Sequence, residues 1–239
     1  MKLVVTNTVF ATLTFNAICS INAVAGILID DFETGSIDVS RLGGSVVEET
    51  QTGLDPSHII GGERLITVGQ SGDAPQHLNI DAGQLKFNSG DSFGYFQVAY
   101  GSSTSPLNLD LLASGANAFV LDFEAPYVPL ARIVLRSSTG SENPSIGNFD
   151  TVFFPSGLAR VVVPFDAYGS VDLRQVEEIV LDVSRVRPLS QIAFLRIATI
   201  PEPSSVCLLA LGALGLSVIR GWHWLAVAHQ CDKVTRGKL

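Results

Sequence analysis

The sequence predicts an all-β protein, an antiparallel jelly-roll β-sandwich preceded by a signal helix and followed by a transmembrane helix. Three observations support this fold class. Short alternating apolar runs recur between 27 and 198, and turn residues separate them at intervals of about ten residues. No apolar stripe at helical period lasts three turns in this region, so a helical core is excluded.

The first 25 residues have the layout of a secretory signal peptide. Lys2 precedes an apolar run, and the small residues Ala23 and Ala25 frame a cleavage site directly before Gly26. We therefore expect a signal peptide at 1–25. The alternative is a buried N-terminal strand or helix.

The predicted domain at 26–200 contains no cysteine, because Cys19 lies in the signal peptide and Cys207 and Cys231 follow the domain. Disulfides cannot stabilise this domain, so its hydrophobic core must do so alone. It carries ten Lys and Arg against twenty-one Asp and Glu, a net charge of −11. This charge repels phosphate backbones and excludes nucleic acid as a partner.

Nine segments of the domain are predicted to be strands. In one of them, 118–124, Phe119, Leu121 and Phe123 point to one face and the carboxylates of Asp122 and Glu124 to the other, the pattern of a half-buried antiparallel strand. Residues 173–178 form a one-turn connector before a strand. The nine segments are 27–32, 64–69, 84–88, 93–100, 118–124, 131–137, 159–165, 177–184 and 192–198.

Two stretches, "IDDFETG" at 29–35 and "VVVPFDAYGSVDLRQVEEIVLDVS" at 161–184, resemble jelly-roll modules of the galactose-binding-like group, which includes many carbohydrate-binding modules. The resemblance implies a strand that runs into a short helical turn and a second strand. It also implies a structural calcium ion near the first strand, for which Asp30, Asp31 and Glu33 are candidate oxygen ligands. The alternative for these carboxylates is a solvated strand end.

Sugar binding in this group uses aromatic side chains. The domain has no Trp and four tyrosines, for which core packing is the alternative role. These tyrosines are Tyr95, Tyr100, Tyr127 and Tyr168.

No motif in the sequence predicts an enzyme. The domain has two histidines, His58 and His77, with no HExxH spacing, and the string "GQSGD" at 69–73 lacks the second glycine of a nucleophile elbow. No phosphate-binding glycine loop occurs. Paired carboxylates leave a polysaccharide hydrolase or lyase open as an alternative.

The segment 204–219 carries no charge and, as a helix, would be roughly 24 Å long. Trp222 and Trp224 follow it at the position of an aromatic belt, and Lys and Arg outnumber acidic residues beyond it. We therefore expect a transmembrane helix within 201–220, a short basic cytoplasmic tail at 221–239 and the domain outside. A buried core helix is the alternative.

The string Pro201-Glu202-Pro203, followed by an apolar helix that ends at Arg220, resembles the PEP-CTERM sorting signal of exported proteins. The resemblance implies recognition by an exosortase, a membrane-embedded cysteine protease or transpeptidase that cleaves near the Pro-Glu-Pro motif. It implies a protein anchored in the cytoplasmic membrane with its domain outside, or released to the cell surface after processing.

The predicted function is therefore that of an exported, non-catalytic cell-surface protein with a structural or adhesive role in the extracellular polysaccharide matrix. A calcium-stabilised carbohydrate-binding module is the principal alternative. Its partners would be an exosortase-like protease, the membrane and a polysaccharide. No cofactor other than structural calcium is expected.

Overall fold

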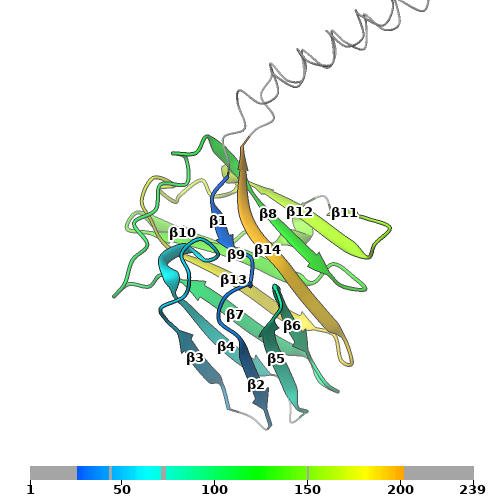
Figure 1. The fold of residues 1–239 in the computed structure, drawn as a ribbon. Helices are drawn as coiled ribbons and strands as arrows, with labels where there is room; N and C mark the ends of the chain where they lie inside the picture. Colours follow the sequence, from blue (N-terminus) through cyan, green and yellow to red (C-terminus); the bar gives the residue numbers. More distant parts are fainter. Residues whose placement is uncertain (1–25, 43–44, 71–73, 150, 202–239) are drawn as a thin grey trace, which may run out of the picture. The chain divides into compact units, whose positions relative to one another are not determined.

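Fourteen strands form two antiparallel sheets that pack face to face in the computed structural model (Figure 1). The structure describes residues 26–42, 45–70, 74–149 and 151–201. The prediction of an all-β antiparallel sandwich is confirmed. The predicted signal helix at 1–25 and the transmembrane helix, which follows Pro201, lie outside the described residues. No helix in the described part of the chain is long and apolar enough to cross a membrane.

The first sheet, sheet A, contains eight strands. Its order is β11-β12-β8-β14-β6-β5-β2, with β1 also paired to β14. The strands are β1 (Leu28–Asp30), β2 (Ile37–Arg41), β5 (Gln76–Asp81), β6 (Gln84–Asn88), β8 (Ala116–Glu124), β11 (Thr151–Phe153), β12 (Leu158–Pro164) and β14 (Gln191–Pro201).

The second sheet, sheet B, contains six strands in the order β10-β9-β13-β7-β4-β3. They are β3 (Val47–Gln51), β4 (Arg64–Gln70), β7 (Gly94–Tyr100), β9 (Leu130–Ser137), β10 (Gly140–Glu142) and β13 (Val176–Val186). Three single turns of 3-10 helix complete the secondary structure: η1 (Ile60–Gly62), η2 (Ile146–Asn148) and η3 (Phe165–Ala167).

The strand β14 organises sheet A because it uses both of its edges. On one side, residues 193–201 pair with β8. On the other side, residues 191–194 pair with β6 and residues 197–198 pair with the short β1. The first and last strands of the domain therefore lie side by side (Figure 1).

The core lies between the two sheets and follows the predicted alternation. Phe119, Leu121 and Phe123 on β8 are completely buried. The ring of Phe194 on β14 lies between those of Phe123 and Phe96, with centroids 5.8 and 6.0 Å away, so aromatic contacts cross from one sheet to the other. Such rings bury large apolar areas, which a domain without disulfides needs.

All nine predicted strands are present, and the short helical turn that the resemblance implies corresponds to η3, directly after β12. The connector predicted at 173–178 is wrong in its second half, because only 173–175 form a turn and 176–178 belong to β13. Five further strands were missed: β2, β3, β5, β10 and β11. The strand β3, with sequence VEETQ, is the edge of sheet B and has one apolar residue, so no alternation marks it.

Candidate functional site

The three candidate calcium ligands lie at the end of β1, and the structure gives each a different environment. The side chain of Asp30 is completely buried. Its Oδ1 accepts the backbone N–H of Phe32 at 2.8 Å, and its Oδ2 accepts Nη1 of Arg64 at 2.8 Å and the hydroxyl of Tyr100 at 2.9 Å. Both carboxylate oxygens of Asp30 are thus occupied by protein donors.

Arg64 is also completely buried and crosses from sheet B to this carboxylate. Its Nε donates to Oε1 of Gln51 at 2.7 Å, and its Nη2 donates to the carbonyls of Thr34 and Gly35, each at 2.7 Å. One carboxylate, one side-chain carbonyl and two backbone carbonyls therefore surround the guanidinium. We call this group the Arg64 cage: Asp30, Thr34, Gly35, Gln51 and Arg64.

The cage has a distinct electrostatic signature. Burial raises the pKa of the Asp30 carboxyl above its ordinary value, and the positive charge of Arg64 opposes that shift. Burial, followed by the charge of Asp30, raises the pKa of the Tyr100 hydroxyl well above its usual value, so Tyr100 stays protonated and donates to the carboxylate. The cage is an ion pair that links the two sheets.

The other two candidates lie outside the cage. Oδ2 of Asp31 is 2.9 Å from Nδ1 of His58, and this hydrogen bond raises the pKa of His58 above its ordinary value. Glu33 is exposed, and its carboxylate lies beside the backbone of Gly83 in the turn between β5 and β6. Asp30, Asp31 and Glu33 therefore do not share one set of contacts.

Among the described residues, no group of three or more His, Cys, Asp or Glu side chains is arranged to hold a metal ion. Arg64 supplies the positive charge that the carboxylate of Asp30 requires. Its charge would repel a divalent cation at the same place. Calcium binding at Asp31 and Glu33 stays a prediction. The other histidine of the described domain, His77, pairs on the surface with Asp38, with Nε2 and Oδ1 2.7 Å apart.

Arg64 and Tyr100 were missed as partners of Asp30, although the sequence held a signal. Arg64 is in phase with the core residues Ile66 and Val68, and Tyr100 is in phase with Phe96 and Val98 on its own strand. An arginine on a buried face must find an anion there. The alternation alone could have placed Arg64 inside the sandwich.

A shallow groove lies on the outer face of sheet A, where three strands run side by side. In the register, Ala193 on β14 lies between Lys86 on β6 and Glu124 on β8. The small alanine leaves a hollow of about 380 Å³ between a cation and an anion. The groove is lined by Gln84, Lys86, Glu124, Ala125, Pro126, Ser156, Gly157, Gln191 and Ala193.

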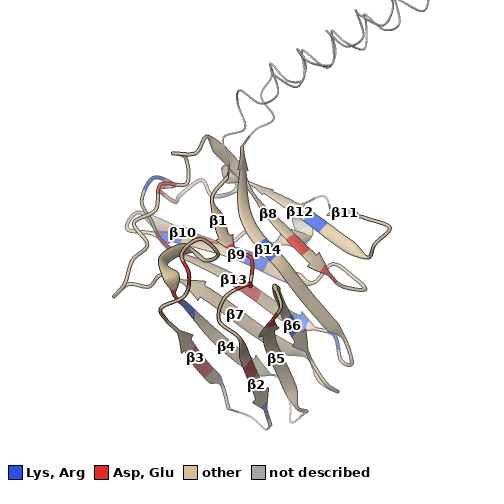
Figure 2. Ribbon diagram, viewed as in Figure 1, with Lys and Arg blue, Asp and Glu red and all other residues tan. Residues whose placement is uncertain are grey.

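Beside the groove, charges of opposite sign alternate across β12, β8 and β14 (Figure 2). Arg160 holds Asp122 through two contacts, Nε to Oδ1 at 2.6 Å and Nη2 to Oδ2 at 2.8 Å. This hydrogen bond raises the pKa of Arg160. Arg196 lies opposite Asp122 on the other neighbouring strand. The outer face of sheet A is thus a polar surface with fixed charges.

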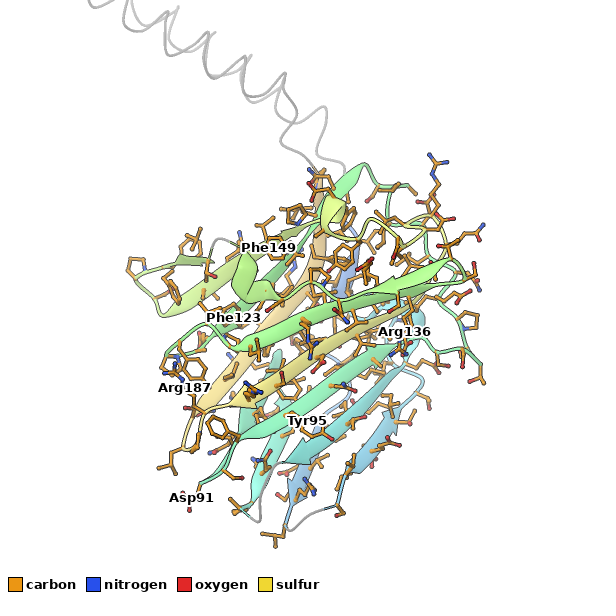
Figure 3. The ribbon with its side chains drawn as sticks, turned by 180° about the vertical axis from the view of Figure 1, so that it is seen from behind. Asp91, Tyr95, Phe123, Arg136, Phe149 and Arg187 are labelled. Atoms are coloured by element: carbon orange, nitrogen blue, oxygen red, sulfur yellow. The ribbon has the colours of Figure 1, made fainter. Side chains whose placement is uncertain are left out.

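The four tyrosines divide between core and surface. Tyr100 and Tyr168 are buried, and the hydroxyl of Tyr168 donates to the carbonyl of Ile133 at 3.1 Å. The other two are half-buried: Tyr95, labelled in Figure 3, lies over Gly69 on sheet B, and Tyr127 packs against the core and against the guanidinium of Arg187, 4.5 Å from its ring centroid. Three of the four tyrosines thus pack in or against the core.

The Pro-Glu-Pro motif starts at the end of β14. Pro201 is the last residue of that strand and lies opposite Ala116 on β8. The first proline of the motif is therefore part of a strand: proline lacks an N–H, but at the end of a strand it costs no ladder hydrogen bond. Glu202, Pro203 and Arg220 lie outside the described residues, as do the predicted cleavage residues Ala23 and Ala25.

Comparison with solved structures finds carbohydrate-binding modules with a β-sandwich fold. A family 11 carbohydrate-binding module of a cellulosomal cellulase of Clostridium thermocellum has 13% identity and a TM-score of 0.36, covering 75% of this chain and 98% of that chain. A family 30 module of a cellulosomal cellulase of the same organism has 18% identity and a TM-score of 0.37, covering 70% and 99%. A β-1,2-glucanase from Parabacteroides distasonis has 10% identity and a TM-score of 0.41, covering 74% and 25%.

No curated protein sequence matches the chain. The family whose model matches is described as the PEP-CTERM protein-sorting motif, and the match covers residues 199–220. The matched segment starts at Thr199, inside β14, and includes the Pro-Glu-Pro string and Arg220. The prediction of a sorting signal is confirmed: the C-terminal part of this chain carries a PEP-CTERM protein-sorting motif.

Proposed function

We propose that this chain is an exported, non-catalytic β-sandwich protein that a membrane-embedded, exosortase-type protease sorts to the cell surface. The observation that carries the proposal is the sorting motif at 199–220, which continues directly from the last strand of the domain. The domain is the cargo of this motif. Its role at the surface is structural or adhesive, within the extracellular polysaccharide matrix.

Two properties of the domain support a structural role. Its core is continuous between the sheets and contains the buried rings of Phe96, Phe123 and Phe194, so the fold needs no disulfide. Two of its buried ionisable groups are paired with each other and with Arg64: the guanidinium of Arg64 pairs with Asp30, and the hydroxyl of Tyr100 donates to Asp30. Before processing, in the proposed arrangement, the domain lies outside the cell and the apolar segment 204–219 lies in the membrane.

The test is to express the full chain in cells with and without an exosortase and to determine the C-terminus of the mature protein by mass spectrometry. We expect loss of the segment after the Pro-Glu-Pro motif only where the exosortase is present. Glu202→Ala should abolish this processing, whereas Glu124→Ala, a surface carboxylate outside the motif, should leave it unchanged. Identical C-termini in both strains would refute the proposal.

A second candidate function is glycan binding in the groove on sheet A. Sugar hydroxyls are recognised by side chains that both donate and accept hydrogen bonds, and Gln84, Lys86, Gln191 and Glu124 supply both kinds around one hollow. The floor at Ala193 lets a ligand approach the sheet closely. These side chains start from three neighbouring strands whose backbone is already fixed, so less conformational entropy is lost when a ligand binds.

This second function is tested by thermal unfolding of the purified protein against a panel of polysaccharides. A ligand at about one hundred times its Kd stabilises the folded state by about 2.7 kcal/mol, which raises the unfolding midpoint measurably. Lys86→Ala and Gln191→Ala should remove the shift, and Gln97→Ala on the opposite sheet should preserve it. A panel without any shift would rule out the groove as a glycan site.

A further inference from the structure

The last residues of β14 are held firmly by the first residues of the domain. Thr199 is 1% exposed. Its N–H donates to the carbonyl of Ile27 at 2.8 Å, and its Oγ1 accepts the N–H of Ile27 at 2.7 Å. A Cβ on Gly26 would clash with the carbonyl oxygen of Thr199, so the two backbones are in close contact.

The other edge of the same segment is paired with β8. Thr199 lies opposite Phe119, Ile200 opposite Ala118 and Pro201 opposite Ala116. Thr199 thus has strand neighbours on both sides. We call this arrangement the β14 clamp: Gly26, Ile27 and Thr199 together with the β8 residues opposite 199–201.

The clamp overlaps the sorting motif, because the match starts at Thr199. A protease that binds its substrate as an extended strand uses the backbone N–H and C=O groups of the residues around the scissile bond. In the folded domain, the backbone N–H of Thr199 is already bonded to Ile27, the residue before β1, and 199–201 lie against β8. The same segment cannot serve the sheet and the protease at once.

We propose that sorting is gated by local opening of the β14 clamp, with Ile27 and Thr199 as positioning residues that hold the N-terminal side of the processing site in the sheet. This inference rests on the proposed function, since it concerns the regulation of that same site. The sorting protease captures chains in which 199–201 have left β1 and β8. When opening and closing are fast, the processing rate follows the population of the open state.

The gate also connects the two ends of the domain. The clamp is built from the first two described residues, Gly26 and Ile27, and signal cleavage after Ala25 would make Gly26 the N-terminus. A chain whose first strand has not docked on β14 lacks the clamp. Processing is therefore sensitive to the state of the N-terminal strand, which is 172 residues away in sequence.

The first test uses Thr199→Val, which keeps the shape of the side chain and removes the oxygen that accepts the N–H of Ile27. Hydrogen exchange of the amide of residue 199 in the purified full chain measures opening, and pulse-chase labelling in exosortase-containing cells measures processing. Loss of one hydrogen bond should raise both rates roughly five-fold. Faster exchange with an unchanged processing rate would overturn the gate.

The second test closes the clamp. Leu28 and Ala198 lie directly opposite each other on β1 and β14, at a separation that suits a disulfide. Leu28→Cys with Ala198→Cys, in a Cys207→Ser and Cys231→Ser background, should lower processing at least ten-fold when oxidised, and reduction should restore it. Processing of the oxidised variant at the native rate would overturn the gate.

A third variant separates the gate from the proposed function. Six Gly and Ser residues inserted between Ile200 and Pro201 move the motif away from the sheet, so processing should become faster and Thr199→Val should have no further effect. If this spacer leaves the rate unchanged while Glu202→Ala still abolishes processing, the sorting function stands and the gate is wrong. If neither the native chain nor the spacer variant is processed, both proposals fail.

Discussion

Replacing Arg64 by methionine tests the Arg64 cage most directly. The change removes the guanidinium from a completely buried carboxylate and keeps most of the side-chain volume. Removal of one partner of a buried ion pair costs about 3–5 kcal/mol, because the other charge stays buried without compensation. A domain of ordinary stability, about 5–15 kcal/mol, would still fold but with a large part of its stability lost.

The cost should depend on pH in a defined direction. The pKa of Asp30 is already raised by burial, and Arg64 is the main group that lowers it. Without Arg64 this pKa rises further, so the folded variant binds a proton more tightly than the unfolded chain does. Between about pH 4 and the folded pKa, the variant loses stability as the pH rises, by up to about 1.4 kcal/mol per pH unit. The destabilisation should be smaller at pH 4.5 than at pH 7.

The assay is urea unfolding of the purified protein at these two pH values. With a slope of about 2 kcal/mol per molar urea, a loss of about 4 kcal/mol lowers the midpoint by about 2 M. The matched control is Arg136→Met, because Arg136 is 56% exposed and pairs with Glu178 at 2.6 Å on the surface of sheet B (Figure 3). It should cost less than about 1 kcal/mol. Equal, pH-independent effects of both variants would refute the reasoning.

Three further predictions follow from contacts in the structure. The hydrogen bond that His58 donates to the carboxylate of Asp31 raises the pKa of His58, so this pair stabilises the fold at acid pH and stops doing so as the pH rises through the raised pKa, above 6.5. Urea midpoints from pH 5 to 8 should show that slope, and His58→Gln should lack it. Tyr168→Phe removes a buried donor to the carbonyl of Ile133 and should cost about 0.5–1.5 kcal/mol in the same assay, with no effect expected on the groove. Addition of EDTA should leave the thermal midpoint unchanged, because a guanidinium neutralises Asp30; a lowered midpoint would show a stabilising metal ion elsewhere.

The alternation of apolar and polar residues predicted the strands that bury one face. It did not predict the strands that are only partly buried. The strand β8 has core residues at every second position and was recognised, as was β6 with Leu85 and Phe87. The strand β11 was missed because it lies at the edge of sheet A, where two of its three residues stay exposed and nothing enforces a polar outer face. Edge strands carry a weaker pattern because fewer neighbours constrain them.

The parts of the candidate site that are contiguous in sequence could be predicted. The parts that depend on how the strands pair in sheet A could not. The sorting motif is a contiguous string, so its residues could be read directly. The clamp that holds its first residue requires Thr199 to meet Ile27, a pairing that only the arrangement of strands in sheet A creates. The groove likewise depends on Lys86 and Glu124 flanking Ala193 across three strands.

The surroundings of Asp30 show why the oxygen atoms in a sequence do not by themselves identify the cation that they bind. A carboxylate, a side-chain carbonyl and two backbone carbonyls are the oxygen donors that a calcium ion requires. The same donors satisfy a buried guanidinium, which has its own five N–H groups to satisfy. A sequence that gathers such oxygens therefore predicts a bound cation without saying whether the cation is an ion or a side chain. Here the cation is covalently part of the chain, because Arg64 reaches the carboxylate from a strand of the other sheet. The guanidinium cannot dissociate from the chain, so its ion pair with Asp30 is a permanent link between sheet A and sheet B.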